Sequence, residues 1–319
     1  MMIKILANDG ISNAGKELLE KNGYIVSTEN VSQEKLAETI NAEGYSVLLV
    51  RSATKVRKEL IDACPGLKII GRGGVGMDNI DVEYAKKKGI KIINTPASSS
   101  SSVAELVFTH FFSLSRFLFD SNRKMPLEGE TKFKELKKKY NKGNELRGKR
   151  LGIIGFGRIG QEVAKIGIGL GMDIIAHDKY VSSMNVDLSF FDKQKISFKI
   201  KTTTLNDLLI NSDYITIHIP KINQKPIITK KEFKLMKDGV VIVNTSRGGI
   251  IDEEALLEYI NAKKVKAAGL DVFINEPEPN IKILMNENLS LSPHIGGSTI
   301  EAQNRIGLEL AEKIIKLYK

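Results

Sequence analysis

Hydrophobic and polar positions follow two alternating patterns along this chain. Apolar runs of strand length occupy residues 3–9, 46–52, 67–74 and 90–96. Between them, residues 13–23, 32–44 and 58–66 repeat apolar side chains every three or four positions and end near a glycine. Strand-length runs that alternate with helical segments are typical of parallel βαβ units. The first hundred residues therefore predict one small doubly wound α/β unit.

The same alternation returns in the second half of the chain. Apolar runs at 149–157, 173–178, 214–220, 239–248, 265–273 and 288–294 predict a second parallel sheet. Residues 182–201 fit neither pattern, whereas residues 298–319 predict an amphipathic helix capped by Ser298 or Thr299. The predicted fold class is α/β, with two doubly wound parallel-sheet (Rossmann-like) domains.

A long apolar stretch separates the two runs of strands. Residues 101–119 predict a helix that begins at a serine cluster and is apolar on most faces, so we expect it to be buried between domains or between subunits. The domain boundaries that we expect are 1–99 plus 292–319 for one domain and 100–291 for the other, inserted one.

Composition narrows the classes of protein. Hydrophobic residues are 42% and charged residues 27%, which is ordinary for a soluble globular chain. The N-terminus has no apolar run of signal-peptide length, and no window approaches the roughly 18 apolar residues of a membrane span. The single cysteine, Cys64, excludes an intrachain disulfide and favours a reducing, cytoplasmic location. With one cysteine and four scattered histidines, no metal-ligand spacing is present.

The net charge of +10 raises nucleic acid as a partner, but its distribution argues against that. Residues 122–150 hold eleven Lys and Arg against four Glu, so +7 of the charge lies in this one segment. Residues 131–140 read as a lysine-rich amphipathic helix with Phe133, Leu136 and Tyr140 on one side. The segment is interpreted as a solvated connection, with a site for acidic partners or substrates as the alternative; no nucleic-acid-reading module is evident.

A dinucleotide fingerprint opens the second run of strands. Gly155, Gly157 and Gly160 directly follow a strand and begin a helix, and Asp178 ends the next strand, 23 positions after Gly155. The glycines permit a tight turn, close approach to a pyrophosphate and close helix–strand packing, while the helix N-terminus stabilises the phosphates. Asp178 is expected to bind the adenosine ribose hydroxyls and to repel a 2′-phosphate, which predicts NAD rather than NADP.

Three polar residues follow three successive strands. Arg247, Glu276 and His294 are separated by 29 and 18 positions, about one βα unit each. Because ligands bind at the carboxyl ends of such strands, the three are expected to converge. A histidine can accept the proton of a 2-hydroxy acid, a carboxylate can orient and charge-stabilise its ring, and a guanidinium can hold the substrate carboxylate. The set predicts hydride transfer to or from a 2-hydroxy acid.

These segments resemble the D-2-hydroxyacid dehydrogenase family over essentially the whole chain. The stretches "MKDGVVIVNTSRGGIID", "GLDVFINEPEP", "SPHIGGSTIEAQ" and "DYITIHIPKINQKPII" are similar to its signatures. The resemblance implies that an NAD domain is inserted into a substrate domain of flavodoxin-like fold. It also implies that Asp271 contacts the nicotinamide carboxamide. Further cofactor contacts are expected from Arg158, Ile159, His218, Pro220, Thr245 and Gly297.

Within the family, residues 50–56, 71–96 and 294–305 are most similar to the phosphoglycerate dehydrogenases. That similarity implies that Arg51 and Arg72, with backbone amides near Gly74 and Val75, help Arg247 and His294 to bind an anionic substrate. A phosphate and a carboxylate together need more cationic groups than Arg247 provides. The expected reaction is the oxidation of 3-phosphoglycerate to 3-phosphohydroxypyruvate, the entry to serine synthesis. The chain ends at Lys319, so we expect no C-terminal regulatory domain.

Other functions stay open at this point. The nearest is the same chemistry on an unphosphorylated acid such as hydroxypyruvate, glyoxylate or lactate. A more distant one is an NAD-sensing, corepressor-like binding protein, since relatives of that kind can retain the Arg–Glu–His set. The apolar helix and the basic segment beside it favour a homodimer through the NAD domain.

Overall fold

The computed structural model describes residues 2–221 and 225–318, which form two compact units. Unit 1 is Met1–Ser102 with Gly297–Lys319, and unit 2 is Val103–Gly296. The predicted boundaries, after residues 99 and 291, precede these division points by three and five residues. The second difference has a physical cause, because hydrogen bonds hold Ser292, Ile295 and Gly296 to Asp271 of unit 2.

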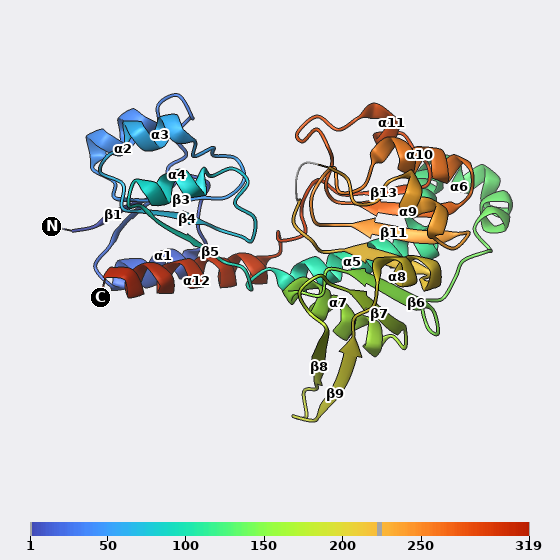
Figure 1. Ribbon diagram of the computed structural model, residues 1–319. Helices are drawn as coiled ribbons and strands as arrows, with labels where there is room; N and C mark the ends of the chain where they lie inside the picture. The colour runs from blue at the N-terminus through green and yellow to red at the C-terminus, as the bar shows by residue number, and fades with distance from the viewer. Residues whose placement is uncertain (1, 222–224, 319) are drawn as a thin grey trace. The chain divides into compact units, whose positions relative to one another are not determined.

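Unit 1 contains a five-stranded parallel sheet in the order β2-β1-β3-β4-β5 (Figure 1). Its strands are β1 (Lys4–Ala7), β2 (Ile25–Ser27), β3 (Val47–Val50), β4 (Ile69–Arg72) and β5 (Lys91–Asn94). This order is the flavodoxin-like one. Four of the strands coincide with predicted apolar runs, while β2 was not predicted. It has only three residues and one buried side chain, Val26, which gives no detectable alternation.

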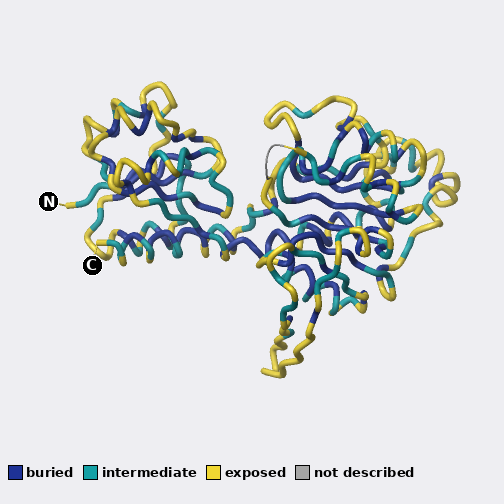
Figure 2. The backbone as a smooth tube through the Cα atoms, viewed as in Figure 1, coloured by how far each residue is buried: buried dark blue, intermediate teal, exposed yellow. Residues whose placement is uncertain are grey.

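Helices cover both faces of the unit 1 sheet (Figures 1 and 2). On one face lie α2 (Leu36–Glu43), α3 (Lys58–Ala63) and α4 (Val82–Lys87), which pack on Leu6, Leu48 and Ile70 of the sheet. On the other lie α1 (Asn13–Lys21) and α12 (Ile300–Tyr318), where Leu19 and Ile314 meet Ile5 and Leu49. The Thr299 hydroxyl accepts a hydrogen bond from the amide of Ala302, so Thr299 caps α12 as predicted.

Unit 2 contains a six-stranded parallel sheet in the order β13-β12-β11-β10-β6-β7. The strands are β6 (Arg150–Ile154), β7 (Asp173–His177), β10 (Tyr214–Ile217), β11 (Val240–Asn244), β12 (Val265–Leu270) and β13 (Leu289–Leu291). All six lie within the predicted runs. The chain passes from β6 outward to β7 and returns to β10 on the other side of β6, so the strand order reverses beside β6. The predicted fold class, α/β with two parallel sheets, is confirmed.

Two groups of helices cover this sheet. One face is packed by α8 (Leu205–Asn211), α9 (Lys230–Leu235) and α10 (Glu253–Asn261), with α11 (Ile281–Leu284) at its edge. The other is packed by α5 (Ser100–Ser115) and α7 (Arg158–Gly169). From α5, Val107, Phe111 and Leu114 are buried against strand residues such as Ile153 and Val243. The helix is therefore buried, as expected, and its apolar side completes the core of unit 2. A contact of this helix with another domain or subunit stays a prediction.

The segment after α5 differs from its prediction. The helix ends at Ser115, Phe117 adopts a left-handed backbone with φ 55°, and α6 (Leu118–Lys139) begins at once. Its basic half is kinked at Lys132, and Leu136 is buried whereas Phe133 is 56% exposed. The predicted apolar side of this helix is therefore only partly covered.

Residues 182–201, which the sequence patterns left unassigned, form an antiparallel hairpin of β8 (Ser183–Ser189) and β9 (Lys195–Lys201). Val186 and Ile200 at its base pack into the core of unit 2, while its tip is exposed (Figure 2). Among residues 2–221 and 225–318, no helix is long and apolar enough to cross a membrane.

Candidate active site

The three predicted catalytic residues follow neighbouring strands of the unit 2 sheet. Arg247 lies three residues after β11, Glu276 lies six after β12, and His294 lies three after β13. These strands are adjacent and parallel, so all three residues emerge at the same edge. The convergence expected from the strand spacing is present in unit 2.

His294 and Glu276 form a hydrogen-bonded pair. Nδ1 of His294 lies 2.7 Å from Oε2 of Glu276. An ionised carboxylate only accepts hydrogen bonds, so Nδ1 carries the proton and donates it. Nε2 is then the ring nitrogen that can take or give a proton. His294 also has a left-handed backbone, with φ 54°, which turns the chain directly after β13.

Glu276 is held on both of its carboxylate oxygens. Oε1 accepts a hydrogen bond of 2.9 Å from the amide of Phe273, and Oε2 accepts the one from His294. Burial raises the pKa of Glu276. The two hydrogen bonds and the charges of His294 and Arg247 lower the pKa by more than burial raises it, so it lies below its ordinary value. The carboxylate is therefore ionised at neutral pH, as an orienting partner for a proton-carrying histidine must be.

A buried acid supports the loop that carries Glu276. The Glu253 carboxylate accepts a hydrogen bond of 2.8 Å from the amide of Ile274, two residues before Glu276. Burial raises the pKa of Glu253, and the nearby charges of Asp252 and Glu276 act in the same direction, while the Ile274 hydrogen bond opposes them. Sequence reasoning missed Glu253. As the first residue of a capped helix, it resembled an ordinary N-terminal acid.

Arg247 is brought to this loop by a close backbone approach. A Cβ at Gly248 would overlap the carbonyl of Phe273, so only glycine lets the chain after β11 lie against the Glu276 loop. The side-chain nitrogen Nδ2 of Asn244 donates a hydrogen bond of 3.0 Å to the Arg247 carbonyl and shapes the turn. The charge of Arg247 contributes to lowering the pKa of Glu276, so the two side chains share one electrostatic environment. Gly248, too, was missed by the sequence reasoning.

The predicted dinucleotide loop lies between β6 and α7. Gly155 has φ 93°, and a Cβ there would crowd the His218 carbonyl; a Cβ at Gly160 would overlap the carbonyl of Gly155. A Cβ at Gly157, in contrast, would have nothing within 4 Å. Gly157 is the N-cap of α7 and has no side chain to bind the first amides of that helix. This open approach to a 12-residue helix fits the pyrophosphate of a dinucleotide.

Asp178 is bonded to the same loop. Its Oδ2 accepts a hydrogen bond of 2.7 Å from the amide of Phe156, and Oδ1 accepts from the amides of Tyr180 and Val181. Burial raises the pKa of Asp178, but these amides and His177 bring it below its ordinary value. The carboxylate is charged, as repulsion of a 2′-phosphate requires, and Oδ2, which accepts only one hydrogen bond, keeps acceptor capacity. The role of Asp178 toward the ribose stays a prediction.

Two buried polar atoms mark the ends of β10 and β11. Within the part of the chain that the structure describes, Nδ1 of His218 and Oγ1 of Thr245 have no hydrogen-bond partner. Burial lowers the pKa of His218 to about 3, so the ring is neutral, and its Nε2 lies 2.9 Å from the Thr216 hydroxyl. Unpartnered buried polar atoms are rare in proteins. Both residues were predicted to contact the cofactor, and these atoms fit a ligand that supplies the missing hydrogen bonds.

The other predicted cofactor residues occupy varied positions. Arg158 and Ile159 begin α7, and Pro220 follows β10 shortly before residues 222–224, which lie outside the described residues. Gly297 belongs to unit 1. Asp271 is fully buried, and its oxygens accept hydrogen bonds from the Ser292 hydroxyl and the amides of Ile295 and Gly296. Its carboxylate therefore holds the segment that follows His294.

The predicted substrate residues of unit 1 lie at the ends of two neighbouring strands. Val50 of β3 pairs with Arg72 of β4, and Arg51 is the next residue after Val50. Asp9 accepts hydrogen bonds from the amides of Arg51 and Thr54, at 2.6 and 3.1 Å, which fixes the loop after β3.

Beside them, Gly74 has φ 143°, and a Cβ there would overlap the Arg72 guanidinium. Val75 follows and is 39% exposed. Unit 1 therefore presents two guanidinium-bearing segments and a glycine-containing turn at one edge of its sheet.

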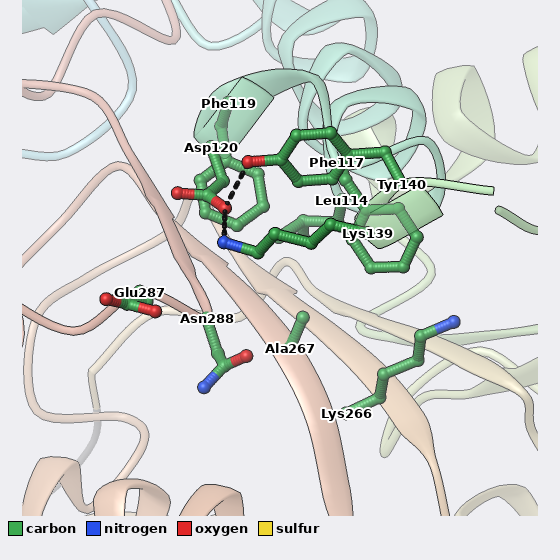
Figure 3. A pocket seen from close by; sticks show the side chains of 10 residues that line it. All are labelled: Leu114, Phe117, Phe119, Asp120, Lys139, Tyr140, Lys266, Ala267, Glu287 and Asn288. Atoms are coloured by element: carbon green, nitrogen blue, oxygen red, sulfur yellow. Dashed lines mark hydrogen bonds and ion pairs between the residues drawn. The ribbon is translucent and has the colours of Figure 1, made fainter. Parts of the chain in front are cut away.

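A pocket of about 150 Å³ lies elsewhere in unit 2 (Figure 3). Asp120 lines it and is bound by the ammonium of Lys139 at 2.8 Å and the hydroxyl of Tyr140 at 2.7 Å. Lys266 and Ala267, which also line it, begin β12, so the pocket opens at the amino ends of the strands. None of the predicted site residues lines it. Among the described residues, no group of three or more His, Cys, Asp or Glu side chains is arranged to hold a metal ion.

The chain is similar to several known proteins. Residues 108–296 match the model of the D-isomer specific 2-hydroxyacid dehydrogenase, NAD binding domain, which confirms NAD as the cofactor. The chain is 43% identical to a hydroxypyruvate reductase from Thermotoga maritima, over 98% of this chain and 97% of that protein. It is 40% identical to a D-3-phosphoglycerate dehydrogenase from Archaeoglobus fulgidus, over 99% of this chain but only 58% of that longer protein. A glyoxylate reductase structure from Paecilomyes thermophila is 30% identical, with a TM-score of 0.80 and coverage of 98% and 94%.

Proposed function

Because the chain belongs to the NAD-dependent D-isomer specific 2-hydroxyacid dehydrogenase family, we propose that it oxidises 3-phospho-D-glycerate to 3-phosphohydroxypyruvate. This reaction is the first step of serine synthesis. The observation that carries the proposed chemistry is the 2.7 Å hydrogen bond between His294 and Glu276, because it leaves Nε2 of His294 as the proton-accepting atom.

In the proposed oxidation, His294 removes the proton of the 2-hydroxyl group while the C2 hydrogen leaves as hydride. NAD, when bound, accepts that hydride and becomes NADH. Glu276 stabilises the charged ring that His294 becomes, and Arg247 binds the substrate carboxylate and polarises the carbonyl that forms. The proton on Nε2 is then released to solvent, so one hydroxy acid and NAD⁺ yield one keto acid, NADH and H⁺. In reduction His294 donates the same proton.

The residues proposed to hold NAD are those of the β6–α7 loop together with Asp178, His218 and Thr245. The open side of Gly157 and the uncapped start of α7 support a pyrophosphate there. The unpartnered Nδ1 of His218 and Oγ1 of Thr245 support further hydrogen bonds to the cofactor.

The phosphate of the proposed substrate is assigned to Arg51 and Arg72. Two features support this assignment: Arg72 ends β4 and Arg51 directly follows the neighbouring strand β3, and Asp9 accepts a hydrogen bond from the amide of Arg51, which fixes the loop that carries it. Guanidinium groups bind phosphate through paired hydrogen bonds, so two of them suit a doubly charged group.

Reduction of hydroxypyruvate, without a phosphate, is the second candidate. It is favoured by the 43% identity to a hydroxypyruvate reductase of nearly the same length, since the chain covers 97% of that protein. The two candidates share the His294, Glu276 and Arg247 chemistry and differ only in the demand on Arg51 and Arg72.

We also propose a cytoplasmic homodimer formed through unit 2. Five large apolar side chains on α5 and α6 support this proposal because they are exposed and a partner subunit could cover them: Phe112, Leu118, Met125, Leu127 and Phe133. The free thiol of Cys64 suits a reducing compartment. Light scattering during size exclusion tests the dimer, and a monomeric mass at micromolar concentration contradicts it.

A substrate panel tests the proposed function. The purified protein is assayed by NADH absorbance with 3-phosphohydroxypyruvate, hydroxypyruvate, glyoxylate and pyruvate. The proposal predicts the highest kcat/KM for 3-phosphohydroxypyruvate. A higher kcat/KM for hydroxypyruvate selects the second candidate, and no turnover of any of the four acids contradicts both.

A further inference from the structure

A buried histidine on α5 stands apart from the residues discussed so far. His110 is 3% exposed, with Nδ1 2.9 Å from the Ser290 hydroxyl and Nε2 3.0 Å from the Ser292 hydroxyl. A Cβ at Gly269 of β12 would come within 2.9 Å of the Cβ and Cγ atoms of His110, so glycine lets α5 approach the sheet at this point. The ring is therefore fixed against β12 and β13.

The hydrogen bonds continue from His110 to the backbone that follows His294. The Ser292 hydroxyl donates to Oδ1 of Asp271 at 2.6 Å. Asp271, fully buried, accepts hydrogen bonds of 2.8 Å from the amides of both Ile295 and Gly296. Since Ile295 and Gly296 come directly after His294, the chain from His110 ends on the turn that presents the catalytic ring.

The direction of each hydrogen bond follows from this arrangement. The single hydroxyl hydrogen of Ser292 is donated in the hydrogen bond to Asp271. The Ser292 oxygen therefore accepts a hydrogen bond from Nε2 of His110. Burial lowers the pKa of His110, with the charge of Asp271 opposing the shift, so the ring carries one proton, on Nε2. Nδ1 then carries no proton and accepts a hydrogen bond from the Ser290 hydroxyl. Each polar atom of His110 has one defined role.

We propose that His110 is a positioning residue that, through Ser292 and Asp271, fixes the backbone presenting His294. This inference rests on the proposed role of His294 in proton transfer. Without the hydrogen bond from Nε2 of His110, the Ser292 side chain can rotate. Asp271 then loses the hydrogen bond that Ser292 donates to its Oδ1. A displacement of about 1 Å at a reacting group is sufficient to lower a rate by on the order of a hundredfold.

Two substitutions separate the two halves of the His110 contact. In His110→Gln the amide nitrogen reaches the place of Nε2, which keeps the hydrogen bond to Ser292. In His110→Asn the shorter carboxamide reaches only the place of Nδ1, which keeps the hydrogen bond to Ser290. We expect His110→Asn to lower kcat by about tenfold to a hundredfold with KM changed less than about twofold, and His110→Gln to stay within about threefold of the wild type.

Two further variants keep the test valid if His110→Asn folds poorly. Ser292→Ala is expected to lower kcat as His110→Asn does, and the double variant to be no worse than either single one, because they break the same path. Ser290→Ala removes the other hydrogen bond and is expected to leave kcat unchanged. Equal losses in His110→Asn and His110→Gln, or a folded Ser292→Ala with full kcat, overturn the inference.

A measurement without substrate distinguishes failure of this inference from failure of the proposed function. The chain has four histidines, so ¹⁵N-histidine spectra can be assigned residue by residue. His110 is expected to show a protonated Nε2 and a bare Nδ1 at neutral pH, and the His294 signals to shift in Ser292→Ala but not in Ser290→Ala. The opposite tautomer of His110 overturns the inference. The expected spectra from a protein that turns over no 2-keto acid overturn the proposed function instead.

Discussion

Nδ1 of His294 donates a hydrogen bond of 2.7 Å to Oε2 of Glu276, although 18 positions of the chain separate them. Glu276 follows β12 and His294 follows β13, an adjacent parallel strand, and the chain between the two residues contains α11 and β13. In the proposed reaction, this bond leaves Nε2 of His294 to exchange protons with substrate, and the charge of Glu276 stabilises the protonated ring.

Glu276→Gln isolates that charge. The amide oxygen of Gln can still accept from Nδ1 of His294, while the negative charge that stabilises the protonated ring is lost, together with the hydrogen bond that Oε1 accepts from the amide of Phe273. For reduction, which needs that protonated ring, we expect the alkaline limb of the kcat/KM profile to move to lower pH by on the order of one unit. Initial rates of NADH oxidation across a pH series measure this limb, and an unmoved limb rules out the electrostatic role.

The lowered pKa of Glu276 also predicts how stability depends on pH. The pKa of Glu276 is lower in the folded protein than in the unfolded chain, where it is near 4.5. The ionised carboxylate therefore stabilises the fold at pH values above 4.5, and this stabilisation is lost as the pH falls through the pKa of the folded state. The difference in unfolding free energy between wild type and Glu276→Gln should therefore shrink as the pH is lowered below about 5. Urea denaturation at several pH values tests this, and a constant difference contradicts the assigned cause.

Gly157→Ala tests the cofactor site without disturbing the fold. A Cβ at Gly157 meets nothing within 4 Å in the protein, and neither does one at Gly169, at the end of α7. Gly169→Ala, inside the helix, should be more stable than wild type by up to about 1 kcal/mol. Gly157→Ala should lower stability by less than about 1 kcal/mol, because glycine is preferred to alanine at an N-cap. Only Gly157→Ala should weaken NAD, by about tenfold or more, because its methyl group crowds the pyrophosphate. Calorimetric titration with NADH measures this, and equal affinities for the two variants contradict the site.

The sequence alone was sufficient to predict features that depend only on the order of strands, turns and helices along the chain. The glycines at 155, 157 and 160 lie between a strand and a helix, as predicted, because strand, turn and helix are adjacent in the chain. Arg247, Glu276 and His294 lie at one edge of the sheet, as predicted, because the carboxyl ends of parallel strands meet there. Both inferences need only the order of elements, which apolar periodicity reports well.

The rest depended on contacts between distant segments. The site of α5's burial could not be predicted, because an apolar helix packs equally well on its own sheet or on another domain. The hairpin at 183–201 escaped prediction because only the base of its apolar face is covered. His110 stood in an apolar helix 180 positions from its partner Ser290, and no local pattern joins the two. Asp271 was assigned by resemblance, which does not report that its oxygens are bonded to Ser292, Ile295 and Gly296.

Arg51→Gln tests the proposed phosphate contact, with Arg57→Gln as its matched control. Both variants remove one guanidinium from unit 1, but Arg57 pairs with Asp81 at 2.9 Å. We expect Arg51→Gln to lower kcat/KM for 3-phosphohydroxypyruvate at least about tenfold more than for hydroxypyruvate, because only the former has the phosphate. Arg57→Gln should change both substrates equally. Parallel losses in Arg51→Gln favour the unphosphorylated substrate.

The central claim is that His294 transfers the proton in an NAD-dependent reaction of a 2-hydroxy acid. The most direct measurement compares wild type with His294→Gln, using the best substrate from the panel for kcat and fluorescence titration for NADH affinity. The account predicts a fall in kcat of about 10²–10⁴-fold with NADH affinity within about threefold of the wild type. A His294→Gln variant that keeps most of its kcat would contradict the account.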